Sequence, residues 1–199
     1  ITITASHNPK EYNGLKIWGI WGEKIQEIKS IFYSKKFYQN VKGEKGKIKK
    51  YDVVKDYIFY LINHFPKLRN AAIDAVIDCG NGMAGVVFPE IIKAFNWKNV
   101  KLLFEKVDGN FPNHSADPTV PENMICVKDE LAKDTSFKIG LGLDGDCDRM
   151  NPMSRQGELV SGDKLLSVYA RNIIKENSNA VVVCDIKSSS SLLELLKKL

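Results

Sequence analysis

Residues 75–85 read AVIDCGNGMAG, an apolar run that passes into an acid and then a glycine-rich loop. The apolar residues 75–77 predict a buried strand, and the three glycines predict a tight turn that opens a helix over 86–95. A second apolar run at 100–104 predicts another strand. Because parallel strands need a crossover between them, this order predicts a βαβ unit.

The sequence on both sides extends this α/β pattern. Apolar residues recur at helical spacing in four more segments, two of which have a predicted cap in Asp52 or Ser161. Short apolar or alternating runs predict further strands. The predicted helices cover 53–65, 123–132, 161–174 and 191–199, and the predicted strands cover 15–18, 137–143 and 180–185, the last of them buried.

Several local features indicate how the chain is organised. Asn151-Pro152 predicts a strand that is short or at a sheet edge, because proline cannot donate a ladder hydrogen bond. The strand–acid–loop–helix order of 75–95 returns at 180–199, which predicts a repeated architecture. The polar stretch GEKGKIKK at 43–50 suits a connection between domains. The first residues read as the end of a strand and the last helix has no cap, so we expect a chain truncated at both ends.

Composition and charge argue against several partners. Charged residues make up 27% of the 199 residues, but the lysines and arginines behind the net charge of +5 are scattered except in the run 42–50. We interpret that run as a solvated linker, so no nucleic-acid partner is expected. No run of 18 apolar residues is present, so no membrane partner is expected. Four separated cysteines without a C-x-x-C pattern predict reduced, mostly buried thiols and a cytoplasmic location. The tryptophans are expected in the core or at interdomain contacts.

An acidic loop, DGDCDR, follows one of the apolar strands. Its aspartates Asp144, Asp146 and Asp148 alternate, so a looped backbone points them to one side. Crowded carboxylates raise each other's pKa unless a cation neutralises them, and Mg²⁺ suits such an oxygen site. An EF-hand is excluded, because Arg149 and Arg155 stand where that loop needs Gly and Glu. A solvated acidic turn is the alternative, although Arg149 favours a site that holds phosphate bidentately.

The stretch TASHNP at 4–9 places a serine on a predicted loop between strands. A serine hydroxyl is a weak nucleophile, and His7 faces away from Ser6 in an extended chain, so no dyad of these two is expected. A phosphorylated Ser6 would carry a charge of about −1.5 to −2 and would suit a cation held by the three aspartates. A polar turn fixed by Pro9 is the alternative for this stretch taken alone.

With these motifs together, the chain resembles the α-D-phosphohexomutases, the phosphoglucomutase and phosphomannomutase superfamily, and is most similar to its bacterial bifunctional phosphomannomutase/phosphoglucomutase branch. The resemblance implies mixed sheets flanked by helices in repeated domains. Residues 1–48 would be the C-terminal part of the first domain, 49–156 the second, and 157–199 the N-terminal part of the third. The matching stretches are TASHNP at 4–9, YNGLK at 12–16, DCGNGMAG at 78–85, DGNFPNH at 108–114, DGDCDR at 144–149 and GELVSGD at 157–163.

The resemblance also implies an activity. It indicates an isomerase of carbohydrate metabolism, an intramolecular phosphotransferase that interconverts the 1- and 6-phosphates of glucose or mannose through a phosphoserine and a bisphosphorylated sugar. Ser6 matches the phosphoserine and Lys16 the candidate general acid/base. The other matches are Asp144, Asp146 and Asp148 with a phosphoserine oxygen of Ser6 as Mg²⁺ ligands, His7 and Arg149 at the phosphate site, and Asn8 and Lys187 at the substrate.

Some features depart from the family pattern or allow another function. Cys147 stands where the family usually has glycine, so it is expected to crowd the metal loop. Residues 80–85 also satisfy G-x-G-x-x-G, with Glu105 twenty residues beyond, which predicts an NAD(P)-binding Rossmann domain instead. The mutase interpretation treats these glycines as structural and also accounts for the serine and acidic loops. Because the family uses four domains, a third alternative is a non-catalytic piece that only folds or associates, and the 199 residues alone are expected to be inactive.

Overall fold

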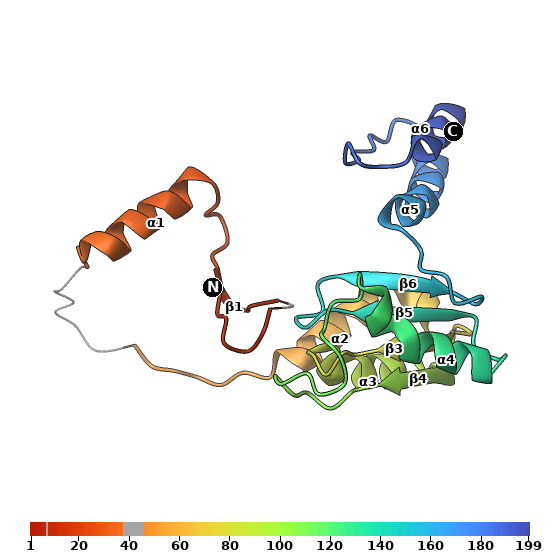
Figure 1. The fold of residues 1–199 in the computed structure, drawn as a ribbon, viewed down its shortest axis with the longest axis horizontal. Helices are drawn as coiled ribbons and strands as arrows, with labels where there is room; N and C mark the ends of the chain where they lie inside the picture. Colours follow the sequence, from red (N-terminus) through yellow and green to blue (C-terminus); the bar gives the residue numbers. More distant parts are fainter. Residues whose placement is uncertain (7, 38–45) are drawn as a thin grey trace.

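The computed structural model describes residues 1–6, 8–37 and 46–199, so His7 and part of the predicted linker lie outside the described residues. Its central unit is a four-stranded sheet in the order β4-β3-β5-β6 (Figure 1). β3 is parallel to β4 and β5, whereas β5 and β6 are antiparallel, so the sheet is mixed as predicted. These strands are β3 (Asp74–Asp78), β4 (Asn99–Leu103), β5 (Ile139–Leu143) and β6 (Met150–Ser154).

Helices flank this sheet, and the predicted βαβ unit is confirmed by α3, which joins the parallel strands β3 and β4. The backbone N–H of Val54 donates to Asp52 at 3.2 Å, which confirms the predicted cap of α2. The predicted helix over 123–132 begins instead as a 3-10 turn, because Pro121 sets the first φ of that turn. The elements are α2 (Val53–His64), η1 (Pro66–Leu68), α3 (Ala84–Phe95), η2 (Pro121–Met124) and α4 (Ile125–Lys133).

Side chains of β3 alternate between the two faces of the sheet and so enter two separate cores. Val76 packs in one cluster with Val127 and Leu131 of α4. Ala75 and Ile77 pack in the other, against residues of α3. β3 is therefore a central strand covered on both faces, and the loop that leaves its carboxyl end is held from both sides.

β6 lies at the sheet edge, as Pro152 predicts. Pro152 pairs in register with Leu141, and its carbonyl accepts from the N–H of Val160 at 2.8 Å on the outer side. The backbone position of Pro152 that lacks an N–H therefore faces away from β5, on the side where no strand of the described residues requires a donor.

The N-terminal segment carries the serine loop on a small hairpin. β1 (Thr2–Ile3) and β2 (Leu15–Lys16) pair antiparallel, so Ser6 lies between two strands as predicted. β2 ends earlier than expected, because Gly19 has φ +81° and turns the chain.

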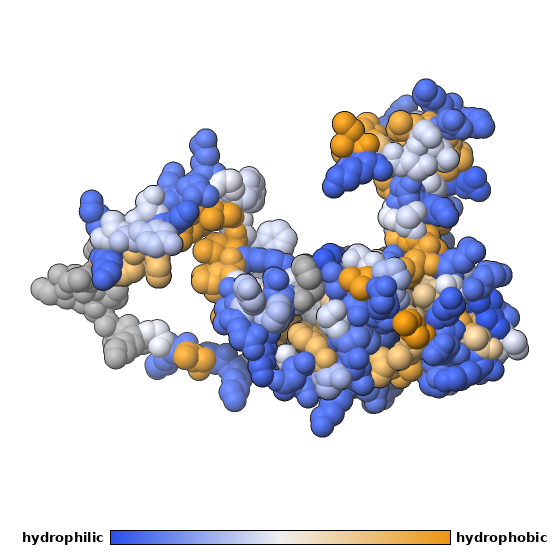
Figure 2. Space-filling model, viewed as in Figure 1, coloured by the Kyte–Doolittle hydropathy of each residue, from blue (hydrophilic) through white to orange (hydrophobic). Residues whose placement is uncertain are grey.

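Apolar side chains beyond this hairpin are exposed. Trp18 and Trp21 are 89% and 73% exposed, so neither lies in the core, and their predicted alternative place at interdomain contacts stays a prediction. α1 (Glu23–Ser34) follows and buries none of its residues. Figure 2 shows apolar surface along α1 and the segment that leads to it.

The C-terminal segment consists of α5 (Gly162–Glu176) and α6 (Ser190–Lys198), which pack on each other beyond β6 (Figure 1). The predicted buried strand at 180–185 is wrong: these residues form no strand, and Val181 is 88% exposed. A strand forms only when its backbone groups are paired, and no described strand lies beside this segment. Ser161 occupies the N-cap position of α5, but its hydroxyl bonds Asp163 and not the helix backbone, so the predicted cap bond is also wrong.

The predicted burial of the cysteines holds only in part. All four are free; Cys79 is buried, Cys147 and Cys184 are half-buried, and Cys126 is exposed on α4. Among the described residues, no helix combines the length and apolar character that crossing a membrane requires.

Candidate functional site

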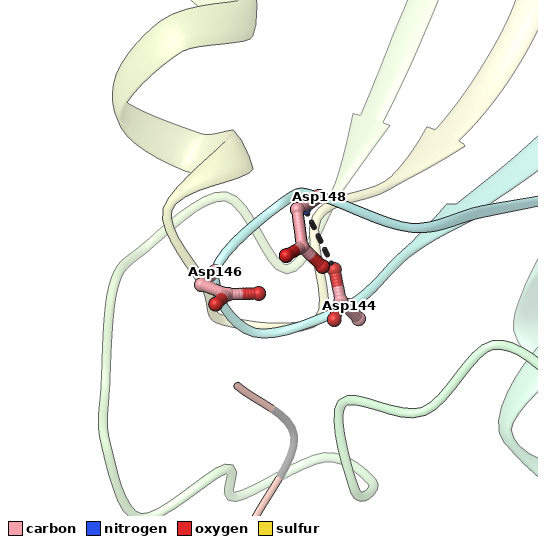
Figure 3. A group of neighbouring side chains, drawn as sticks. All are labelled: Asp144, Asp146 and Asp148. Atoms are coloured by element: carbon pink, nitrogen blue, oxygen red, sulfur yellow. Dashed lines mark hydrogen bonds between the residues drawn. The ribbon is translucent and has the colours of Figure 1, made fainter. Parts of the chain in front are cut away.

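The acidic loop leaves the carboxyl end of β5, and its three aspartates converge as predicted (Figure 3). One ligand atom from each of Asp144, Asp146 and Asp148 lies within 4.8 Å of the others. Side-chain exposure rises along the loop: Asp144 is buried, Asp146 is half-buried and Asp148 is exposed. The loop closes through the N–H of Cys147, which donates to the Asp144 carbonyl at 3.0 Å. The tight turn thus explains why alternate residues share one side.

Asp144 anchors the site, because both of its carboxylate oxygens accept hydrogen bonds. Its Oδ1 accepts the backbone N–H groups of Asp148 at 3.0 Å and Arg149 at 2.9 Å. Its Oδ2 accepts Nε of Arg149 at 2.9 Å and the Ser6 hydroxyl at 3.1 Å. A buried carboxylate that accepts four hydrogen bonds is fixed in orientation.

The serine loop meets the acidic loop across 138 residues of sequence. Nη2 of Arg149 donates to Ser6 Oγ at 2.9 Å, so the hydroxyl lies between a carboxylate and a guanidinium. Ser6 has φ +55°, a left-handed conformation that costs a non-glycine residue energy and is concentrated at functional sites. Thr4 contributes too: its hydroxyl donates to Asp146 Oδ2 at 2.7 Å and accepts the Ser6 N–H at 2.9 Å. Sequence reasoning missed Thr4, whose only signal was its place in TASHNP.

Lys16 adds a positive charge on the open side of the aspartates. Its Nζ lies 3.0 Å from Asp148 Oδ2 and 3.5 Å from Asp146 Oδ2. The hydrogen bond to Asp148 and the charge of Asp146 raise the pKa of Lys16, against a smaller opposing effect of desolvation. Burial raises the pKa of Asp146, but the Thr4 hydrogen bond and the Lys16 charge outweigh it and lower this pKa overall.

The donor set fits a hard divalent cation. Among the described residues, Asp146 Oδ1 is a buried side-chain oxygen with no hydrogen-bond partner. Such an atom costs free energy unless something binds it, and it lies in a group of three carboxylates that could hold a metal ion. A cation with oxygen ligands would satisfy it and offset the mutual repulsion of the aspartates.

A cavity of about 750 Å³ opens beside these groups. Its wall combines the polar site residues with an aromatic side: it includes Ser6, Lys16, Asp146, Asp148, Trp18 and Trp21. Its volume lies in the range of small-molecule sites.

The other predicted site residues lie apart from this centre or outside the described part. The Asn8 side chain donates to the Ala5 carbonyl at 3.0 Å and so closes its own turn. Lys187 lies on the loop before α6, where its N–H donates to Asp185 at 2.8 Å, and within the described residues no hydrogen bond or ion pair of its side chain links it to the three aspartates. His7 is outside the described residues.

The glycine loop contacts protein where a Rossmann domain would contact a nucleotide. A Cβ on Gly82 would lie 2.6 Å from the Gly145 carbonyl oxygen, and one on Gly85 would lie 1.7 Å from the Glu105 carbonyl oxygen. The N–H of Met83 donates to the Gly145 carbonyl at 2.9 Å. The acidic loop thus covers the start of α3, which contradicts the NAD(P) alternative and confirms the structural role of the glycines.

Cys147 occupies a position that glycine would fill without strain. Its φ is +63°, in the left-handed region. Its side chain packs against the core cluster that contains Cys79, and burial raises its pKa to about 11. The side chain at this position therefore packs partly on the core, while the charges of all three aspartates still reach its thiol.

His114 provides a prediction on pH. Its Nε2 lies 2.9 Å from Asp78 Oδ2, and this hydrogen bond raises the pKa of His114 above its ordinary value of 6.5. The stabilisation is complete below the unfolded pKa and is lost as pH rises through the higher folded pKa, so the free energy of unfolding is expected to fall over a pH interval that begins near 6.5 and extends above it. Urea unfolding across this interval checks it, and His114→Gln should flatten the slope; an equal slope in both proteins would contradict the assignment.

This arrangement defines a class: an α/β/α domain in which an acidic loop at a strand end meets a serine loop from a preceding segment. The model of phosphoglucomutase/phosphomannomutase α/β/α domain II matches residues 55–157, and that of domain I matches residues 1–39. The chain belongs to the phosphoglucomutase/phosphomannomutase family.

Individual relatives agree with this membership. The phosphomannomutase/phosphoglucomutase of Pseudomonas syringae is 34% identical over all of this chain and 42% of its own length, and the phosphomannomutase of Methanocaldococcus jannaschii is 32% identical over 100% and 44%. A crystal structure of a family protein from Burkholderia thailandensis superposes with a TM-score of 0.86 at 30% identity, over 98% of this chain and 42% of that one. The chain therefore spans about 42% of the length of such relatives.

Proposed function

We propose that the protein is a hexose-phosphate mutase, an isomerase that interconverts hexose 1-phosphate and hexose 6-phosphate of glucose, mannose or both. Ser6 carries the transferable phosphoryl group. A free hydroxyl of the sugar phosphate attacks this phosphorus, the bond from phosphorus to Ser6 Oγ breaks, and a bisphosphorylated sugar forms. The bisphosphorylated sugar then reverses its orientation in the site, and its other phosphoryl group is transferred to Ser6.

One observation carries this proposal: the Ser6 hydroxyl lies within hydrogen-bond distance of both Asp144 and Arg149. Phosphoryl transfer depends mostly on positioning and on neutralising charge at the phosphoryl oxygens. Arg149 is placed to hold such oxygens, and Lys16 is the candidate for the group that takes or gives the proton of the sugar hydroxyl.

Asp144, Asp146 and Asp148 would hold Mg²⁺, and a phosphoryl oxygen on Ser6 would be a further ligand. The ion, when bound, would supply positive charge that offsets the phosphoryl charge. The unpartnered Asp146 Oδ1 and the all-oxygen donor set support this assignment. His7, Asn8 and Lys187 are proposed contacts of the phosphate and sugar.

The domain boundaries at 48 and 156 are part of the same proposal, supported by the two family-model matches. Relatives are more than twice as long as this chain, and we propose that residues 1–199 alone do not turn over substrate. We also propose that the protein acts in the cytoplasm on small sugar phosphates, without nucleic-acid or membrane partners.

Intact-mass spectrometry of a protein that continues to the length of its relatives tests the donor. We expect one added phosphate after incubation with a glucose or mannose bisphosphate and Mg²⁺, and none in Ser6→Ala. Conversion of glucose 1-phosphate to glucose 6-phosphate should disappear in the same variant. A phosphate retained in Ser6→Ala, or full turnover by that variant, would refute the role of Ser6.

A further inference from the structure

A charged pair lies near the acidic loop, and the proposed reaction does not use it. Asp78 ends β3 and is 1% exposed, and His114 comes from the proline-rich segment 108–122. Their side chains meet at 2.9 Å, and the His114 ring packs edge-on against Phe104 at 5.3 Å. Burying a carboxylate costs free energy, so a fully buried one needs a compensating partner.

Both nitrogens of His114 face acceptors. Nε2 faces the Asp78 carboxylate, and Nδ1 lies 2.9 Å from the carbonyl oxygen of Ser115. The Ser115 carbonyl and a carboxylate are both acceptors, so this arrangement favours the imidazolium form, in which both ring nitrogens donate. When protonated, His114 supplies a counter-charge for the Asp78 carboxylate.

The other oxygen of Asp78 fixes the glycine loop. Asp78 Oδ1 accepts the N–H of Gly80 at 2.7 Å. Gly80 has φ +54°, and a Cβ there would lie 3.3 Å from the Leu143 carbonyl oxygen and 3.4 Å from Ala116. Its backbone is thus confined between the end of β5 and the proline-rich segment.

The glycine loop in turn holds the acidic loop. The N–H of Met83 bonds the Gly145 carbonyl at 2.9 Å, and Gly82 is packed directly against Gly145. On its other side, a Cβ on Gly145 would lie 2.5 Å from the Ser6 carbonyl oxygen. Gly145 stands between Asp144 and Asp146, so a shift of the glycine loop moves the carboxylates and their approach to the serine loop.

A second connection ties the proline-rich segment to the same loop. Asn113 Nδ2 donates to Asn81 Oδ1 at 2.8 Å, and Asn81 Nδ2 donates to the Lys106 carbonyl at 2.8 Å. Farther along, Asn123 Nδ2 donates to Ser115 Oγ at 2.8 Å. The segment that presents His114 is therefore fixed on both sides of the histidine.

We propose that Asp78 and His114 form a positioning pair that sets the geometry of the three-aspartate loop through the glycine loop. Among the described residues, neither side chain forms a hydrogen bond or ion pair with the acidic carboxylates, so the pair acts through Gly80, Met83 and Gly145. This inference rests on the proposed metal site. It adds that two residues outside the proposed reaction position the loop that carries the metal ligands.

Binding of Mn²⁺ to the 199-residue chain, followed by the electron paramagnetic resonance of the free ion, tests the pair. Mn²⁺ is a fitting probe because it prefers the same oxygen ligands as Mg²⁺. His114→Ala is expected to weaken Mn²⁺ binding about tenfold, at the low end of the effect of groups that orient metal ligands. Added imidazole should fill the space and restore the affinity. His114→Gln, which keeps an N–H donor toward Asp78, serves if the alanine variant does not fold, and should show a smaller loss.

Leu131→Ala is the control for general stability, because Leu131 is an apolar core residue of α4 and has no polar group that could support the glycine loop. It should lower the melting temperature while leaving Mn²⁺ affinity unchanged, which separates positioning from general stability. Two results would overturn this inference and leave the proposed metal site standing. One is equal Mn²⁺ affinity in the unaltered chain and in both folded His114 variants. The other is imidazole that restores the melting temperature of His114→Ala without restoring its Mn²⁺ affinity. No Mn²⁺ binding by the unaltered chain would overturn the proposed metal site and this inference with it.

Discussion

Asp144→Asn is expected to weaken divalent-cation binding by about a hundredfold or more, a larger loss than for partners that only orient ligands. Asparagine has nearly the same shape, but its NH₂ group would face donors, because both oxygens of Asp144 accept from N–H or O–H groups. The substitution also removes the buried carboxylate opposite the Arg149 guanidinium and leaves buried hydrogen bonds poorly matched, which is expected to cost about 1–3 kcal/mol of unfolding free energy. Mn²⁺ titration and urea unfolding measure the two effects separately.

Asp134→Asn is the control for charge alone. Asp134 is exposed at the end of α4, and its carboxylate accepts from the backbone N–H of Ser136 at 2.8 Å. Asp134→Asn removes one negative charge from the chain, as Asp144→Asn does, but leaves the three-aspartate loop intact, so the Mn²⁺ affinity should stay unchanged. If Asp144→Asn bound Mn²⁺ as tightly as Asp134→Asn does, Asp144 could not be a ligand of the ion.

Local sequence was enough to predict the central fold and the convergence of the aspartates. The apolar run and glycines at 75–85 predict a strand, turn and helix from interactions between near neighbours, and all three are present. The aspartates converge because a tight turn at a strand end fixes their side within five residues. Pro152 likewise predicts an edge strand from its missing N–H alone.

Features that depend on distant segments were not available from the residues themselves. The meeting of Ser6 with Asp144 spans 138 residues, and only the family resemblance indicated it. Thr4 was missed because a lone threonine has no pattern until its hydroxyl is seen between Ser6 and Asp146. The strand predicted at 180–185 failed for the same reason: β-structure needs a neighbouring strand, and the apolar pattern does not say whether one lies alongside.

The roles of glycines are also decided by distant contacts. Gly80 and Gly157 have positive φ, which local turn patterns can indicate, whereas Gly85 does not. The need for glycine at Gly85 comes from Glu105, which reaches it only after the chain has passed through α3 and β4. In the sequence, the G-x-G-x-x-G pattern therefore fits either a nucleotide-binding loop or a structural turn. The backbone of Gly145 packs against Gly82, which favours the structural turn.

Gly85→Ala is expected to destabilise the α/β unit by about 3 kcal/mol or more, near the upper end of overpacking effects. Gly85 is the second residue of α3, and at an exposed helix position this substitution would stabilise the helix by about 1 kcal/mol. Here the new Cβ would lie 1.7 Å from the carbonyl oxygen of Glu105 and 2.7 Å from its carbonyl carbon. No side-chain rotation relieves a clash with backbone, so the start of α3 must move away from the end of β4. Urea unfolding measures the loss, with Gly109→Ala and Gly162→Ala as controls, because neither glycine has an atom within 4 Å of an added Cβ or a positive φ. Gly162 begins α5, so its substitution tests helix propensity alone and should be neutral or stabilising. If Gly85→Ala were as stable as these two, the close approach of α3 to the backbone of Glu105 would be wrong.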